Sequence, residues 1–145
     1  MHTTEILLVE DNPDDLEMTL HALRKAKVAN HIHVARDGVE ALDFIFCEGP
    51  FVGRKMEDGP KVILLDLKLP KVDGREVLAR IKGDPRTRKI PVIVLTSSKE
   101  QNDVVNTYDL GVNSYIVKPV NFEQFVASVQ ELGMYWLLLN QPPIF

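Results

Sequence analysis

Five short apolar runs rich in β-branched residues recur along this chain of 145 residues and alternate with amphipathic stretches. The runs are Ile6–Val9, Ile32–Ala35, Val62–Leu65, Val92–Leu95 and Tyr115–Val117. Their length and composition predict strands. The first, third and fourth are apolar throughout, which is typical of parallel strands covered by helices on both faces. In the second run histidines alternate with Ile32 and Val34, which favours an edge strand.

Helical patterns separate these predicted strands. Apolar residues recur three or four positions apart in five stretches, around Leu16–Leu23, Ala41–Phe46, Val77–Ile81, Val104–Tyr108 and Phe122–Leu132. Asn12 before Pro13, and Asn121 before the last stretch, are suited to cap helix N-termini. Strand and helix thus alternate along the chain, which predicts an open, doubly wound α/β sheet with parallel strands and right-handed crossovers.

Two stretches depart from this alternation. Residues 48–60 contain glycines, prolines and charges of both signs, which is typical of a long loop. At the C-terminus Tyr135–Leu139 continues the apolar pattern and predicts an extension of the last helix, which Pro142 and Pro143 then stop. We therefore expect one domain over residues 1–145, with an extended C-terminal helix and tail.

Charge and composition exclude several classes of protein. Seventeen basic against 21 acidic residues give a net charge of -4, and the chain lacks the basic runs of a nucleic-acid binder. The single Cys47 cannot form an internal disulfide, and the first apolar run is too short for a signal peptide or a membrane span. We therefore expect a cytoplasmic protein that binds neither nucleic acid nor membrane. Nucleotide-binding glycine loops and the G-x-S-x-G elbow of hydrolases are also missing from the sequence.

Charged and hydroxyl residues follow four of the predicted strands. They are Glu10 and Asp11 after the first strand, Asp66 after the third, Thr96 after the fourth and Lys118 after the fifth. Ligands bind at the carboxyl ends of the strands in open α/β sheets, so these residues predict a site. Three carboxylates at one rim repel one another, which raises the pKa of one of them or requires a cation. Mg²⁺ fits best, because it takes a few oxygen ligands together with water and phosphate oxygens.

The same motifs, in the same order, resemble the receiver domain of two-component response regulators. They are Val9-Glu-Asp11, Leu65-Asp66 with Pro70 and Asp73-Gly74 behind it, Leu95-Thr-Ser97 and Val117-Lys-Pro119, and they span nearly the whole chain. The resemblance implies a flavodoxin-like, five-stranded parallel sheet with strand order 2-1-3-4-5 and five helices. It also implies a cis peptide bond between Lys118 and Pro119.

The resemblance further implies a phosphoryl-transfer site. Asp66 would accept a phosphoryl group from the phosphohistidine of a sensor histidine kinase, and Thr96 and Lys118 would hold the phosphoryl oxygens. Thr96 and Tyr115 would then act as a switch that shifts the balance between an inactive and an active surface. Such a protein catalyses only its own phosphorylation and dephosphorylation.

The metal site that the resemblance implies contains Glu10, Asp11, Asp66 and the backbone carbonyl of Lys68. Many family members have Asp where this chain has Glu10, and the longer arm leaves open whether Glu10 contacts Mg²⁺ directly or through water. A second open question is whether the Lys68 side chain, with Ser98, modulates the access of water to the acyl phosphate.

Partners are expected because the receiver pattern occupies the whole chain. The long loop, Leu67-x-Leu-Pro70-Lys71, Asp84–Pro91 and a tail that contains Trp136 resemble small regulators that serve bacterial and cyanobacterial phytochrome kinases. The apolar tail predicts a homodimer formed through the C-terminal helix and the face of helix four, strand five and helix five. Receivers remodel this face on phosphorylation, which would couple dimerisation to the chemistry of Asp66. A constitutive dimer, or a fold-back of Ile144 and Phe145 onto the same molecule, is the alternative.

Two other functions compete with the phosphorylated signalling protein. An Mg²⁺-dependent phosphohydrolase with an aspartyl-phosphate intermediate would need a general acid two residues after Asp66, where this chain has Lys68. A degenerate receiver would serve only as a binding module, and the complete set of acidic pair, phosphoacceptor, Thr96 and Lys118 argues against it.

Overall fold

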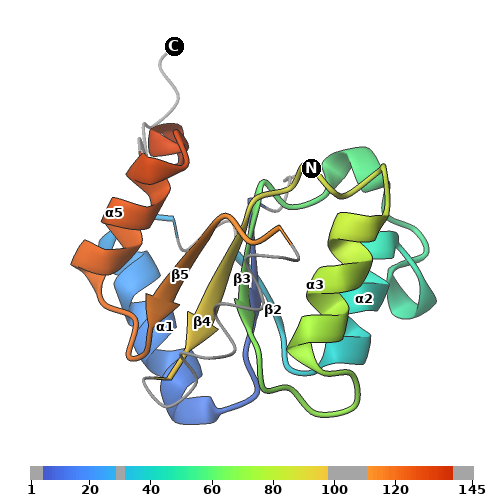
Figure 1. Cartoon of the computed structure of the whole chain (residues 1–145), viewed down its shortest axis with the longest axis horizontal. Helices are drawn as coiled ribbons and strands as arrows, with labels where there is room; N and C mark the ends of the chain where they lie inside the picture. Colours follow the sequence, from blue (N-terminus) through green and yellow to red (C-terminus); the bar gives the residue numbers. More distant parts are fainter. Residues whose placement is uncertain (1–4, 29–31, 98–110, 139–145) are drawn as a thin grey trace.

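Five parallel strands form one sheet in the order β2-β1-β3-β4-β5 (Figure 1). This computed structural model describes residues 5–28, 32–97 and 111–138. The strands are β1 (Ile6–Val9), β2 (Ile32–Ala35), β3 (Val62–Asp66), β4 (Val92–Thr96) and β5 (Ser114–Val117). Every neighbouring pair is parallel. The predicted sheet and its strand order are therefore confirmed.

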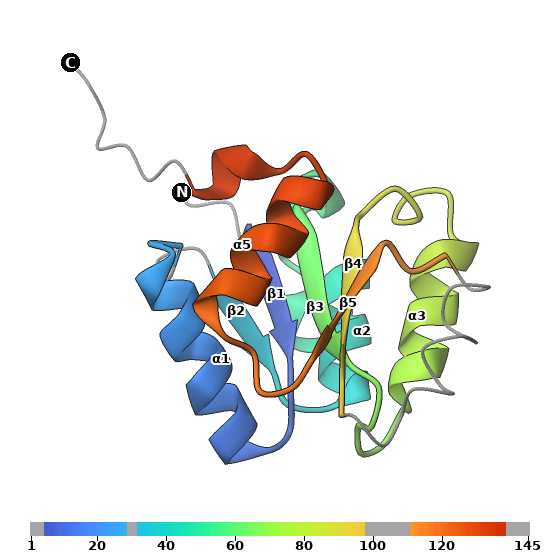
Figure 2. The ribbon, with the colours of Figure 1, turned by 60° about the vertical axis from the view of Figure 1, so that its left-hand side comes forward.

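Helices cover both faces of the sheet (Figures 1 and 2). On one face lie α1 (Pro13–Lys25) and α5 (Phe122–Glu131), and on the other lie α2 (Gly38–Phe46) and α3 (Gly74–Gly83). The predicted helix around Val104 and Tyr108 falls outside the described residues. None of the helices within the described ranges is long and apolar enough to cross a bilayer.

The buried side chains form two clusters, one on each face of the sheet. Leu8 packs with Leu23 of α1 and Phe125 of α5. Its neighbour Leu7 packs on the opposite face, in the cluster that contains Ala41 of α2 and Leu78 of α3. Successive side chains of a strand point to opposite faces. The strands with continuous apolar runs are thus buried on both sides.

Polar side chains cap the helices at the end of the molecule where the strands end. The side chain of Asn12 accepts hydrogen bonds from the backbone N–H groups of Asp14 and Asp15, and so fixes the first turn of α1. Asn121 and Gln124 form a capping box at the start of α5. Both caps that the sequence predicts are present.

The C-terminal segment differs from the predicted extension of the last helix. The helix α5 ends at Glu131, and Tyr135–Leu138 forms a separate 3₁₀ turn, η5. Gly133 adopts a positive φ of 70°, and its N–H and that of Met134 bond back to carbonyls of α5. A left-handed glycine with these bonds ends a helix, which is why the apolar pattern does not continue as one. Leu137 of η5 is buried in the cluster beneath α1 and α5.

The loop of residues 48–60 contains two short 3₁₀ turns, η2 (Gly49–Phe51) and η3 (Met56–Asp58). Arg54 fastens this loop to α2, because its guanidinium lies 3.6 Å from the centre of the Phe44 ring and donates to the Phe44 carbonyl. His33 of β2 also stacks on the Phe44 ring, with 4.0 Å between the two ring centres. The long loop is thus packed against the α2 side of the sheet.

Candidate functional site

The predicted site residues meet at the carboxyl edge of the sheet, where the strand arrowheads point in Figure 1. Asp66 is the last residue of β3 and Thr96 the last of β4, and Glu10 and Lys118 directly follow β1 and β5. The parallel register aligns these ends, since Val9 pairs with Leu65. The structure therefore brings residues from four strands to one rim.

Lys118 lies at the centre of this rim. Its Nζ is 3.0 Å from Oδ2 of Asp66, 3.2 Å from Oε1 of Glu10 and 3.0 Å from Oδ2 of Asp15. An ammonium has three N–H donors, so each carboxylate takes one. Burial works to lower the pKa of Lys118, but the hydrogen bond to Asp15 and the charges of Asp66 and Glu10 outweigh burial and raise it. Lys118 is therefore a fixed positive charge beside the Asp66 carboxylate.

The Asp66 carboxylate is held through both of its oxygens. Oδ1 accepts a hydrogen bond of 3.1 Å from the backbone N–H of Lys68, and Oδ2 accepts one from Lys118. The side chain is almost fully buried. The carboxylate thus has a fixed orientation at the edge of the sheet.

Glu10, Asp11 and Asp66 form a candidate metal site. Each offers one carboxylate oxygen, and these oxygens lie within 4.8 Å of one another. Opposite ligands of an Mg²⁺ ion are about 4.2 Å apart, because each lies ~2.1 Å from the metal. Glu10 and Asp66 are buried, whereas Asp11 is exposed. Hard oxygen donors at this spacing, with one side open to water, fit Mg²⁺.

Crowding among these acids changes the ionisation of Glu10. Burial, followed by the hydrogen bond and charge of Asp66, raises the pKa of Glu10 to about 8. Lys118 and the N–H of Asn12 act in the opposite direction but do not cancel this effect. Burial and the neighbouring Asp66 thus favour the protonated form of Glu10, and a bound divalent cation would favour the ionised form instead.

Thr96 and Tyr115 occupy different environments. Thr96 is fully buried at the end of β4, and its hydroxyl donates to the Ser97 carbonyl over 3.2 Å. Its own carbonyl accepts a hydrogen bond of 2.7 Å from the N–H of Lys118, which ties the end of β5 to β4. Tyr115, near the start of β5, is 44% exposed. The predicted cis peptide bond between Lys118 and Pro119 is present.

A sequence model of the response regulator receiver domain matches residues 6–130 of this chain. The match includes every strand, all of α1, α2 and α3, and α5 except its last residue. The chain belongs to the receiver domain family of response regulators. Members of this family bind Mg²⁺ or Mn²⁺ at an acidic pocket, and this receiver domain has the Glu-Asp-Asp group for such a pocket.

Three known proteins are similar to this receiver domain over most of their length. The structure of the bacteriophytochrome response regulator RtBRR is 55% identical with a TM-score of 0.86, over 99% of this chain and 85% of that one. A probable methanogenesis regulatory protein, FilR2 of Methanothrix harundinacea (strain 6Ac), is 44% identical over 95% of this chain and 86% of its own.

The third is the response regulator Rcp1 of Synechocystis sp. (strain ATCC 27184 / PCC 6803 / Kazusa), which is 40% identical over 91% of this chain and 88% of its own. A solved structure of Rcp1 in its Mn²⁺-bound form has a TM-score of 0.75 at 38% identity, over 97% of this chain and 99% of that one. The family resemblance and the likeness to phytochrome response regulators that the sequence predicts are therefore confirmed.

Two glycines of the receiver domain allow close packing around the loop that follows Asp66. A Cβ on Gly74 would overlap the backbone of Asp66 and Leu67, and a Cβ on Gly38 would overlap the backbone of Val72. The Gly74 N–H also donates to the Leu67 carbonyl over 2.9 Å. The starts of α2 and α3 thus pack directly against the β3–α3 loop.

Asp15 is a site residue that the sequence reasoning missed. The strand-end rule selects residues that follow strands, whereas Asp15 lies in the first turn of α1, where an acid is expected simply to complement the helix dipole. The spacing in the sequence could have identified it. Asp15 lies only four residues after Asp11, in the first turn of α1, and α1 begins at the rim.

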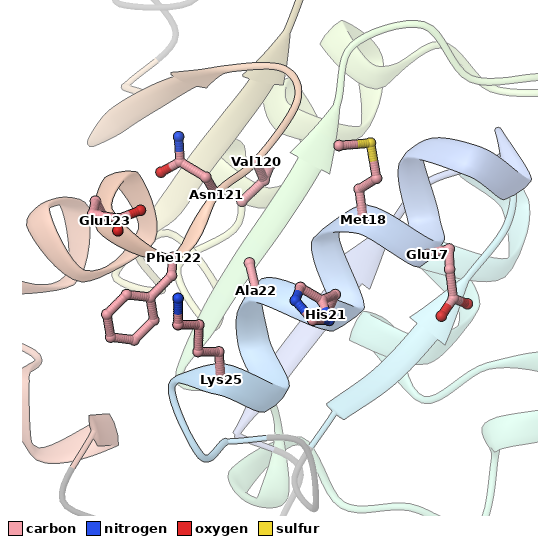
Figure 3. Close-up of a pocket in the computed structure, with 9 residues that line it drawn as sticks. All are labelled: Glu17, Met18, His21, Ala22, Lys25, Val120, Asn121, Phe122 and Glu123. Atoms are coloured by element: carbon pink, nitrogen blue, oxygen red, sulfur yellow. The ribbon is translucent and has the colours of Figure 1, made fainter.

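A groove of about 400 Å³ lies between α1 and the start of α5 (Figure 3). Met18, Ala22, Val120 and Phe122 contribute apolar surface to it, and Met18 is 48% exposed. Lys25 lies over the Phe122 ring at 5.1 Å from its centre. The groove therefore gives the receiver domain a partly apolar surface between α1 and α5.

Proposed function

We propose that this receiver domain takes a phosphoryl group from the phosphohistidine of a sensor histidine kinase onto Asp66. The observation that carries the proposal is the position of Lys118, whose ammonium lies 3.0 Å from Oδ2 of a buried and oriented Asp66. An ammonium at that place compensates the charge that develops on phosphoryl oxygens next to the acceptor carboxylate.

The transfer itself is a nucleophilic displacement at phosphorus. An oxygen of Asp66 forms the new P–O bond, the P–N bond to the donor histidine breaks, and the histidine nitrogen keeps the electron pair. Lys118 and Thr96 hold the equatorial oxygens of the transferred group. The product is an acyl phosphate, which water later hydrolyses.

Glu10, Asp11, Asp66 and the Lys68 carbonyl would hold the Mg²⁺ ion. When bound, the cation supplies positive charge to the phosphoryl oxygens and screens the repulsion between the acids. The protein catalyses only its own phosphorylation and dephosphorylation and acts on no other substrate. Lys68 stands at the position where an aspartyl-phosphate hydrolase would need its general acid.

The kinase that serves this receiver domain is of the bacteriophytochrome type, and it meets the receiver domain in the cytoplasm. The likeness to RtBRR supports this assignment, since that protein is named as a bacteriophytochrome response regulator. A protein donor must place its phosphohistidine at the rim, and the groove between α1 and α5 offers such a donor a contact surface. The phosphorylated receiver domain then signals through contacts with other proteins.

The test of this function is phosphotransfer. An autophosphorylated bacteriophytochrome kinase and a panel of unrelated histidine kinases are each offered to the purified protein with Mg²⁺. Label should pass fastest from the phytochrome kinase and should not pass to Asp66→Asn. Transfer from none of the kinases would contradict the proposal.

Thr96→Ala is expected to separate phosphorylation from signalling. The variant should still be phosphorylated on Asp66, because the nucleophile, the acids and Lys118 remain. It should lose the structural response near Tyr115, since no hydroxyl is left to turn from the Ser97 carbonyl to a phosphoryl oxygen. Hydrogen exchange of β5 with and without phosphorylation measures this response. Thr96→Ser, which keeps the hydroxyl, is the control, and an unchanged response in Thr96→Ala would contradict the switch.

We also expect this receiver domain to form a homodimer as part of its signalling. Tyr115 lies in a groove with Gln124 and Ala127 of α5, and Trp136 of η5 is 45% exposed. These aromatic side chains favour a two-fold homodimer through β5, α5 and the C-terminal segment. Sedimentation of wild-type protein should detect a dimer, and Trp136→Glu should weaken it. A protein that stays monomeric both with and without phosphorylation would exclude this assembly.

A further inference from the structure

Lys118 has one partner that comes from neither a strand end nor the candidate metal site. Asp15, on the first turn of α1, accepts a hydrogen bond from Lys118 Nζ over 3.0 Å, the same distance as that to Asp66. The Lys118 side chain is 14% exposed and that of Asp15 is 32% exposed. Lys118 is thus largely shielded from solvent and Asp15 partly so, and water screens this pair less than it screens an ion pair that lies fully at the surface.

The three carboxylates around Lys118 differ in what else they do. Glu10 and Asp66 belong to the acidic group that fits a divalent cation, and Asp66 is also the proposed nucleophile. Asp15 is not part of that acidic group. When the cation and the phosphoryl group engage the other two carboxylates, Asp15 is the one among the three that remains available to Lys118.

We propose that Asp15 is a positioning residue for phosphoryl transfer, which holds the ammonium of Lys118 over the acceptor carboxylate. The inference rests on the proposed function. Lysine carries its charge on a flexible four-carbon stem, so an ammonium at a reactive centre needs a partner that fixes its place. Asp15 supplies that partner from a different element than the one that carries Lys118.

Both ends of the Asp15–Lys118 contact are anchored in the fold. The N–H of Asp15 donates to the side chain of Asn12 over 3.0 Å, which fixes the backbone of Asp15 in the first turn of α1. The N–H of Lys118 donates to the Thr96 carbonyl over 2.7 Å, which fixes its backbone at the end of β5. The contact therefore sets the position of Nζ from two rigid points.

Asp15 also competes with the phosphoryl group for the charge of Lys118, and this competition acts on the rate in the opposite direction. The two effects predict opposite signs. If Asp15 mainly competed, its removal would raise the phosphorylation rate. If it positions Nζ, its removal lowers the rate at saturating donor, since misplacing a group at a reactive centre by about 1 Å costs on the order of 100-fold and a smaller displacement costs less.

The experiment compares Asp15→Ala and Asp15→Asn with Asp14→Ala, which removes the neighbouring exposed acid of the same helix turn. Each variant is phosphorylated with acetyl phosphate at saturating Mg²⁺, and the rate at saturating donor, the half-saturating donor concentration and the Mg²⁺ affinity are measured. Asp15→Ala should lose about tenfold in rate with the other two quantities unchanged. Asp15→Asn keeps an acceptor oxygen in place and should recover most of the rate. Asp14→Ala should match wild type.

The possible failures are distinguishable. A wild-type protein that gains no phosphoryl group overturns the proposed function and this inference with it. A labelled wild type with an equal or faster Asp15→Ala variant overturns the inference alone. So does a slow Asp15→Ala variant whose loss lies in Mg²⁺ affinity or in thermal unfolding, because Asp15 would then support the metal site or the fold and not the position of Lys118.

Discussion

Asp66→Asn is expected to abolish phosphorylation of this receiver domain. The amide offers no carboxylate nucleophile, and the substitution keeps the shape of a side chain that is almost fully buried at the end of β3. Intact-mass spectrometry after incubation with Mg²⁺ and acetyl phosphate measures the effect. Wild-type protein should gain one phosphoryl group and Asp66→Asn none.

Asp73→Asn is a suitable control for this comparison. Asp73 caps α3 through its side chain, and Asn caps helices equally well, so the fold is preserved while an acid near the site is removed. This variant should be labelled like wild type. Equal labelling of Asp66→Asn would instead place the phosphoryl group on another residue.

Asp11→Ala is expected to reduce Mg²⁺ affinity by at least ~10-fold, the scale on which the loss of residues around a metal acts. Asp11 is the exposed member of the acidic group, so its removal leaves the buried Glu10 and Asp66 with their partners. A metal titration followed by fluorescence or calorimetry measures the change. Asp14→Ala, another exposed acid at the start of α1, should bind Mg²⁺ like wild type. Identical titrations of Asp11→Ala and wild type would remove Asp11 from the site.

The sheet could be predicted from the sequence because parallel strands buried on both faces carry an unbroken apolar signal. Leu7 and Leu8 show why, since they enter different clusters on opposite faces and neither position tolerates a polar side chain. The C-terminal segment was less predictable. Its apolar pattern is real, and Leu137 is buried, but Gly133 ends the helix and the pattern continues in a 3₁₀ turn. Periodicity reports which residues are buried and not where the backbone turns.

The site was predictable to the extent that it lies at strand ends. Asp66, Thr96 and Lys118 are found where parallel strands must end side by side, and the register of the sheet brings them together. Asp15 was not predictable in this way, because its contact depends on the direction in which α1 leaves the rim. Tyr115 was assigned through the family resemblance alone, and its role stays a prediction.

The glycine packing around the β3–α3 loop has a mechanical consequence for the proposed switch. Gly38 and Gly74 leave no space between this loop and the starts of α2 and α3, so the chain beside Asp66 cannot shift toward that side without unpacking two helices. Displacement caused by a new group on Asp66 should therefore be transmitted in the other direction, across β4 to β5. A partner that distinguishes the two states should accordingly bind where Tyr115 is exposed, and a partner bound over α2 and α3 should be insensitive to phosphorylation.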